Sequence, residues 1–169
     1  REGYGYVDNE RFSDARTKEM KSALMQMGVK PENIHIRYLN TDGTFTYEEV
    51  KNLIREYVLK YPGASHKAMS NHDSTLAHAY SGQALVALYN EGLTSDVRLF
   101  ISRYDFNKNL PGWIIKPDSN QAFRIKKAAL SYQAWNPIAG AFAIGYHSVS
   151  SQFNSMLAKI ENKQHRPNE

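Results

Sequence analysis

The 169-residue sequence predicts an α/β protein with a Rossmann-like three-layer sandwich and a mainly parallel sheet. Two observations lead to this fold class. Helical and strand patterns alternate along the chain, which implies right-handed crossovers and helices on both faces of a mainly parallel sheet. The length fits one domain, and the 41% of apolar residues is enough for a core. We therefore expect residues 1–169 to form a single α/β domain.

The first part of the chain predicts a helix, a strand and a second helix. Ser13 is a favourable N-cap for an amphipathic helix that Gly28 is well placed to end. Residues 32–40 then alternate apolar and polar side chains, as a strand does. A T-x-x-E capping box at Thr46 opens an amphipathic helix that runs to Tyr61.

The rest of the chain continues this alternation around an irregular stretch at 136–148. The predicted strands are 65–71 (weakly signalled), 96–102 (the clearest) and 112–117, and the predicted helices are 76–92, 119–135 with Asp118 or Ser119 as cap, and 148–163. A doubly wound domain normally starts with a buried central strand. This chain starts with a loop and a helix instead, so we expect its first strand to be missing.

Composition excludes several classes of function. The chain has no cysteine, which excludes disulfides, a thiol nucleophile and Cys-ligated metal sites. The net charge of +4 comes from Lys and Arg residues that are interleaved with Glu, whereas nucleic-acid binders cluster basic residues on one face. We therefore expect no nucleic-acid partner. No apolar run approaches the roughly 18 residues of a membrane span.

The cellular compartment is left open by the sequence. The chain opens on Arg1 rather than on Met, as a processed or trimmed product would. The absence of cysteine fits export and the cytosol equally well. An exported or cell-surface protein therefore stays among the alternatives.

The stretch S-N-H-D-S-T-L-A-H-A-Y-S-G at 70–82 carries the best metal-ligand candidates. His72 and His78 lack the H-E-x-x-H spacing that places two ligands on one helical face. Asp73 suits an Asx-type cap for the helix that follows. Taken alone, the stretch therefore favours a capped helix start over a metal site.

Three other motifs also have an ordinary structural explanation when each is taken alone. Arg16 and Glu19 have the spacing of a surface ion pair on a helix. Asp42 precedes a glycine and suits a plain turn. Ser148 or Ser150 suits the N-cap of the last helix, which would leave the adjacent His147 incidental.

Taken together and in order, these motifs resemble the LmbE/PIG-L family of zinc-dependent deacetylases, which remove acetyl groups from N-acetylglucosamine-type amines. The resemblance covers about residues 10–155. It comprises R-x-x-E-x-x-x-A-x-x-x-x-G-V from Arg16 to Val29, D-G at Asp42, D-x-x-x-x-H from Asp73 to His78, K-x-A-L from Lys127 to Leu130, and A-I-G-Y-H-S-V at 143–149.

The resemblance implies a zinc site of which this chain holds one part. Residues 75–78 lie on the family's H-P-D-H motif, so His78 is kept as a zinc ligand. Thr75 stands where the family has its first His, and Ala77 stands where it has Asp. The family's H-P-D-D motif, which supplies two zinc ligands and the catalytic base, is not found in the chain. A hydrolytic zinc centre needs about three protein ligands, so further ligands are expected outside this chain's numbering.

The implied function is hydrolysis of an acetyl group from an N-acetylated sugar or glycoconjugate. Without the missing N-terminal fragment, which is the expected partner, we predict that the chain is inactive. Besides the metal ligand His78, the implied site residues are Asp73 and His147 for catalysis, and Arg16, Asp42 and Thr75 for substrate binding.

Two alternatives stay open. The first is a non-catalytic carbohydrate-binding protein on the same scaffold, in which Thr75 and Ala77 mark lost chemistry and tyrosines stack on sugar rings. The second is one lobe of a periplasmic-type sugar receptor, since fold alone does not decide function. A receptor needs a hinge and a second lobe, and neither fits in this chain.

Overall fold

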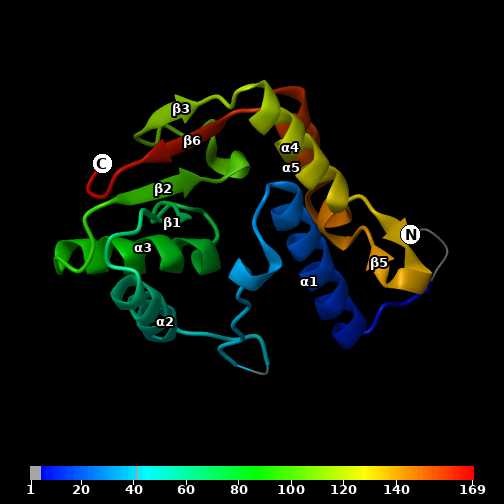
Figure 1. Ribbon diagram of the computed structural model, residues 1–169, viewed down its shortest axis with the longest axis horizontal. Coiled ribbons are helices and arrows are strands. Elements are labelled where there is room, and N and C mark those ends of the chain that lie inside the picture. Colours follow the sequence, from blue (N-terminus) through cyan, green and yellow to red (C-terminus); the bar gives the residue numbers. More distant parts are fainter. Residues whose placement is uncertain (1–4, 41) are drawn as a thin grey trace. The chain divides into compact units, whose positions relative to one another are not determined.

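The computed structural model describes residues 5–40 and 42–169. Contacts divide the chain into two compact units, one of Arg1–Ile36 with Pro117–Ile160 and one of Arg37–Lys116 with Glu161–Glu169. We call the first the helical unit and the second the sheet unit, and we describe each by itself. Together they hold five helices and a four-stranded mixed sheet in the described ranges (Figure 1), which confirms the α/β class.

The sheet unit is built on four strands in the order β1-β2-β6-β3. These strands are β1 (His66–Met69), β2 (Val97–Ile101), β3 (Trp113–Ile115) and β6 (Asn162–His165). β1 and β2 are parallel, whereas β6 is antiparallel to both β2 and β3. The three predicted strands of this unit are confirmed. A mainly parallel sheet is not confirmed, because only the β1–β2 pair is parallel among the strands described.

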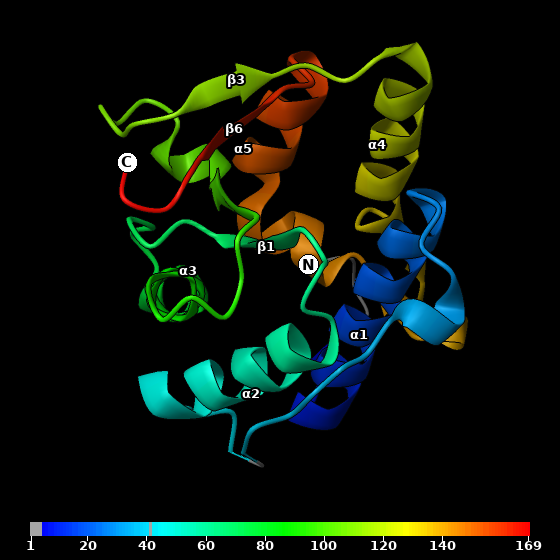
Figure 2. The ribbon, with the colours of Figure 1, turned by 60° about the vertical axis from the view of Figure 1, so that its left-hand side comes forward.

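Two helices cover one face of this sheet. α3 (Leu76–Asn90) lies against β1 and β2, and α2 (Tyr47–Lys60) packs on α3, as Figures 1 and 2 both show. The core between them is a cluster of fully buried aliphatic residues, namely Val58, Leu85, Leu88, Val97 and Leu99. The predicted capping box of α2 is present, since Thr46 and Glu49 bond each other's backbone N–H groups.

The helical unit consists of α1 (Asn9–Gln26), α4 (Ser119–Ser131), α5 (Ile144–Ala158) and a short hairpin of β4 (Trp135–Asn136) with β5 (Ala141–Phe142). α1 packs against α4 and α5 (Figure 1). Its N-cap is Asp8, whose carboxylate accepts the Arg11 N–H at 2.8 Å, so the helix begins earlier than Ser13 predicted. Asp118 caps α4 with Gln121, as expected.

Besides the Ser13 cap, three sequence-based assignments are wrong. Residues 32–40 form no strand, because Pro31–Asn33 is a 3-10 turn and the residues after it pair with none of the described strands. α5 starts at Ile144, so neither Ser148 nor Ser150 is its N-cap. The end of the predicted helix 148–163 is strand β6 instead. Across the described residues, no helix is long and apolar enough to cross a membrane.

Candidate functional site

The loop from Ser70 to Thr75 joins β1 to α3 at the carboxyl end of the parallel strand pair. In open α/β sheets, ligands bind at this edge of the sheet. The Ser70 N–H donates to the Phe100 carbonyl at 2.8 Å and ties the start of the loop to β2. Gly82 of α3 lies so close to this loop that a Cβ there would meet the backbone of Met69, Ser70 and Asn71. The loop is therefore clamped between β2 and α3.

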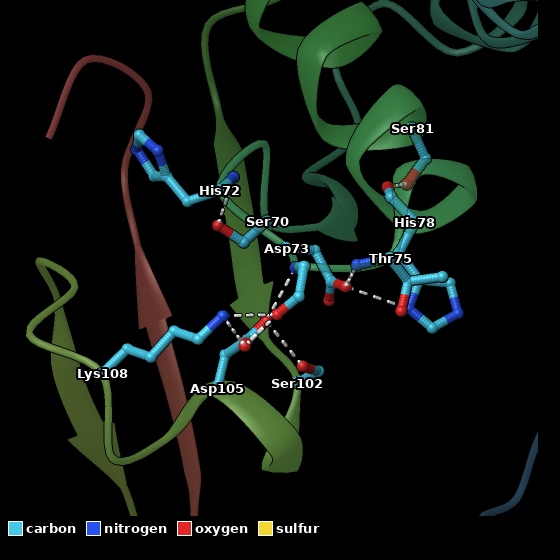
Figure 3. Close-up of polar contacts among 10 residues, drawn as sticks. Ser70, His72, Asp73, Thr75, His78, Ser81, Ser102, Asp105 and Lys108 are labelled. Carbon is cyan, nitrogen blue, oxygen red and sulfur yellow. Dashed lines mark hydrogen bonds and ion pairs between the residues drawn. The ribbon is translucent and has the colours of Figure 1, made fainter.

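Asp73 and His78 form a pair at the start of α3 (Figure 3). The Asp73 side chain is 1% exposed, and its Oδ1 accepts the Thr75 N–H at 2.8 Å and lies 3.3 Å from Nδ1 of His78. The His78 side chain is 51% exposed. Since a carboxylate can only accept, this contact favours the proton on Nδ1 of His78 and leaves Nε2 to another partner. Asp73 makes the predicted Asx-type turn, although the N-cap of α3 is Thr75, and its carboxylate lies against the ring of the predicted metal ligand.

This pair fits one position of a zinc site. Zinc-bound histidines almost always donate the other ring N–H to a carboxylate, a carbonyl or water. Oδ2 of Asp73 is buried and has no hydrogen-bond partner within the described part of the chain. However, no three His, Asp or Glu side chains of the described residues come together as a metal-binding group. The described residues thus offer one candidate ligand and a neighbouring carboxylate, fewer than the three ligands that a catalytic zinc needs.

The other candidates of the sheet unit lie at its surface. Thr75 is the exposed N-cap of α3, and its carbonyl accepts the N–H groups of His78 and Ala79, each at 2.9 Å. Oδ1 of Asp42 accepts the Thr44 N–H at 2.9 Å and the Thr44 hydroxyl at 2.8 Å, which makes the predicted turn. These two hydrogen bonds lower the pKa of Asp42 below its ordinary value. The Asp42 carboxylate is therefore ionised and accessible.

Ser70 and His165 form a buried pair that the sequence did not reveal. Nδ1 of His165 lies 2.8 Å from the Arg166 carbonyl, which can only accept, so Nδ1 carries the ring proton. Nε2 then accepts the Ser70 hydroxyl at 2.8 Å. Both residues are fully buried, so a substrate cannot reach the serine oxygen. The pair fastens β6 to the end of β1 and is not a nucleophilic centre.

A buried carboxylate, Asp105, was also missed. It is fully buried just after β2 and accepts from the Ser74 N–H at 2.9 Å, the Ser74 and Ser102 hydroxyls and the Lys108 ammonium. Burial by itself raises the pKa of Asp105, but the hydrogen bonds from Lys108 and Ser74 outweigh it and hold this pKa well below the ordinary range. Its position just beyond the clearest predicted strand is the one sequence signal that could have identified it.

Arg16 and His147 belong to the helical unit. Nη1 of Arg16 lies 2.9 Å from Glu19, whose carboxylate also accepts the N–H groups of Ile144 at 2.7 Å and Gly145 at 2.9 Å. The predicted ion pair is present, but Glu19 is 3% exposed, so its carboxylate is buried and not at the surface. The carboxylate also binds the N-terminus of α5, where negative charge is favourable. His147 is exposed one turn further along α5, with its ring 6.0 Å from that of Tyr146.

The structure therefore gathers Asp73, Thr75 and His78 at one helix start. It leaves Asp42 in a separate turn and places Arg16 and His147 in the other unit. His72 is directed elsewhere, because its ring lies 5.5 Å from that of His165 and its Nε2 lies 3.3 Å from the Glu169 carbonyl. Comparisons of the chain with protein-family models, with curated proteins and with solved structures find no match.

Proposed function

We propose that this chain is the larger part of a zinc-dependent carbohydrate N-deacetylase of the LmbE/PIG-L type. It removes the acetyl group from an N-acetylglucosamine-type amide. The observation that supports this proposal best is the Asp73–His78 pair: a buried carboxylate faces Nδ1 of a half-exposed imidazole at the carboxyl end of the parallel strands. The H-P-D-H resemblance of residues 75–78 assigns the zinc ligand to the same histidine.

The residues of the pair have distinct roles in this proposal. His78 holds the metal through Nε2, and Asp73 keeps the ring turned by accepting the Nδ1–H. Zinc in such a site lowers the pKa of a bound water to about 7 and polarises the carbonyl that is attacked. The further ligands and the catalytic base come from polypeptide outside this numbering, which is the expected N-terminal fragment.

The remaining candidates act on the sugar and on the leaving group. The half-exposed guanidinium of Arg16 and the exposed carboxylates and hydroxyls of Asp42 and Thr75 suit hydrogen bonds to sugar hydroxyls. His147 is exposed on α5, and an imidazole side chain can donate a proton or a hydrogen bond. We assign it the role of general acid or oxyanion donor.

The proposal includes a mainly parallel sheet in a single three-layer domain. β1 is an edge strand of the described sheet and belongs to its one parallel pair. The N–H groups of His66 and Ser70 donate to the β2 side, so those of Lys67 and Met69 face outward, since successive residues alternate along a strand. Further parallel strands beyond β1 would complete the sandwich.

Metal analysis and an acetate-release assay on the purified protein, with any polypeptide that co-purifies, test this function. The substrate is an N-acetylglucosamine oligomer. We expect bound zinc, and we expect His78→Ala to abolish both zinc binding and acetate release. Asp73→Asn should weaken zinc affinity about 10- to 100-fold, as loss of a carboxylate partner does. His72→Ala is the matched control, an exposed neighbour that should retain both properties. Absence of zinc together with full activity of His78→Ala would refute the proposal.

A second candidate is a carbohydrate-binding protein without catalysis. The observation in its favour is the exposure of aromatic side chains, since Tyr6 is 85% and Tyr104 69% exposed. Such rings can stack on the apolar face of a sugar. The test uses protein whose zinc content has been established. Binding of the same oligomer without release of acetate would favour this candidate over the enzyme.

A further inference from the structure

The proposed chemistry gives no role to Asp105, although its carboxylate is fully buried among four donors. Oδ2 accepts the Ser74 N–H at 2.9 Å and the Ser102 hydroxyl at 3.2 Å. Oδ1 accepts the Ser74 hydroxyl and the Lys108 ammonium, the latter at 2.7 Å. Figure 3 shows the Lys108 and Ser102 side chains converging on this carboxylate. A buried charge with this many donors fixes the groups that surround it.

Two of these four donors belong to the loop that carries the Asp73–His78 pair. Asp105 follows β2, and Ser74 follows β1, the parallel neighbour of β2. The carboxyl ends of parallel strands meet at one edge of a sheet, so the two loops leave the sheet side by side. The Asp105 carboxylate bridges them through both the backbone and the side chain of Ser74.

The position of Ser74 in the sequence makes this bridge relevant to the site. Ser74 lies between Asp73 and Thr75, the two residues of the Asx turn whose hydrogen bond measures 2.8 Å. Holding the Ser74 N–H fixes the peptide unit that it shares with Asp73. The direction of the Asp73 carboxylate, and therefore its approach to Nδ1 of His78 at 3.3 Å, depends on that peptide unit.

We propose that Asp105 is a positioning residue of the Asp73–His78 site. It anchors Ser74, and so keeps the Asp73 carboxylate on the Nδ1–H of His78 and leaves Nε2 for a ligand. This inference rests on the proposed function only for the identity of the ligand that His78 binds, which is zinc. The geometry that it concerns is formed by the chain alone, without metal or substrate.

The tautomer of His78 tests the proposal directly. Long-range ¹H–¹⁵N spectra of the labelled protein, recorded about two pH units above the ordinary histidine pKa of about 6.5, distinguish the Nδ1–H and Nε2–H forms. His78→Gln assigns the signal. We expect the Nδ1–H form in the wild type. In Asp105→Asn we expect the ratio of Nδ1–H to Nε2–H to fall about fivefold, the factor that corresponds to one net hydrogen bond.

Controls separate positioning from a general loss of structure. His165 should keep its Nδ1–H signal in Asp105→Asn and thus report an intact sheet in the same spectrum. Asp118→Asn, which removes a capping carboxylate of α4, is the matched control and should leave His78 unchanged. An Asp105→Asn protein with an intact His165 signal and an unchanged His78 ratio would overturn the proposal.

Loss of the His165 signal would show that Asp105→Asn unfolds the protein. In that case a milder variant, Ser74→Ala, tests the proposal. Ser74→Ala removes the hydroxyl, which donates to Asp105 and accepts from Lys108 at 2.6 Å, and keeps the N–H, so the His78 ratio should fall in the same direction by a smaller factor. An unchanged ratio in Ser74→Ala would count against the proposal. A protein that shows these tautomer shifts but binds no zinc would retain the positioning role and would refute the deacetylase function instead.

Discussion

Two buried polar residues of the sheet unit, Asp105 and His165, are hydrogen-bonded to partners far away in the sequence. The Ser70 hydroxyl meets Nε2 of His165 at a sequence separation of 95 residues, and Asp105 meets Ser74 at a separation of 31. A buried polar group left without its partner costs roughly 1–3 kcal/mol. The sequence pointed to Asp73 and His78, which lie close together in the chain, whereas Asp105 and His165 escaped because their partners are remote.

His165 should make the stability of the protein depend on pH. Burial lowers the pKa of His165, although the hydrogen bond to the Arg166 carbonyl acts in the opposite direction. The folded-state pKa therefore lies below the unfolded-state value of about 6.5, and protonation favours unfolding. The contribution of His165 is fully present above about pH 6.5 and is lost as the pH falls through the folded-state pKa.

Urea unfolding between about pH 7.5 and pH 5 measures this contribution. The free energy of unfolding should fall more steeply with acidification in the wild type than in His165→Gln, which lacks the titrating group. The same pH slope in both proteins would show that His165 is not the group responsible.

At the scale of elements, the starts of α2 and α4 were predictable, whereas the starts of α1 and α5 and the strand partners were not. The capping boxes at Thr46 and Asp118 are local, since cap and partner lie three residues apart. Residues 32–40 have a strand pattern, but a strand also needs a neighbour, and none of the described strands pairs with them. β6 has the polar sequence N-K-Q-H and is a strand because β2 and β3 flank it.

Packing of α3 against the end of β1 gives the second prediction. A Cβ on Gly82 would lie 2.6 Å from the Ser70 carbonyl carbon and closer still to the backbone of Met69 and Asn71. Overpacking of this kind costs about 1–3 kcal/mol, which exceeds the gain of about 1 kcal/mol that Ala brings to a helix interior. Gly82→Ala should therefore lower the free energy of unfolding.

Gly63→Ala is the control for this substitution. A Cβ on Gly63 would meet no atom within 4 Å, and the residue has no positive φ. The smaller conformational entropy of the unfolded chain should make this variant neutral or more stable by up to about 1 kcal/mol. Equal effects of the two substitutions in thermal or urea unfolding would contradict the packing argument.

At the scale of the whole molecule, the path of the chain between its two units is the main feature. The helical unit takes residues 1–36 and 117–160, and the sheet unit takes 37–116 and 161–169, so neither is one continuous segment. The central strand β6 comes from the end of the chain, and without it β2 and β3 share no neighbour. Each unit is therefore complete only when distant parts of the chain are in place.

We accordingly predict one cooperative unfolding transition, as a single domain of residues 1–169 requires. Scanning calorimetry should give a calorimetric enthalpy equal to the van't Hoff enthalpy. Gly82→Ala in the sheet unit and Glu19→Gln in the helical unit should both lower the temperature of that same transition. Two transitions, each sensitive to only one of these substitutions, would show instead that the units unfold independently.

The sequence by itself determined the α/β class, the positions of most helices and three strands, and the adjacency of Asp73 to His78. These features follow from periodicity, capping and short spacing, which act within a few residues. Only the tertiary structure decided the antiparallel insertion of β6, the burial of Glu19 against α5, and the anchoring of Ser74 by Asp105. Each of these depends on a contact between residues far apart in the chain, which no local pattern encodes.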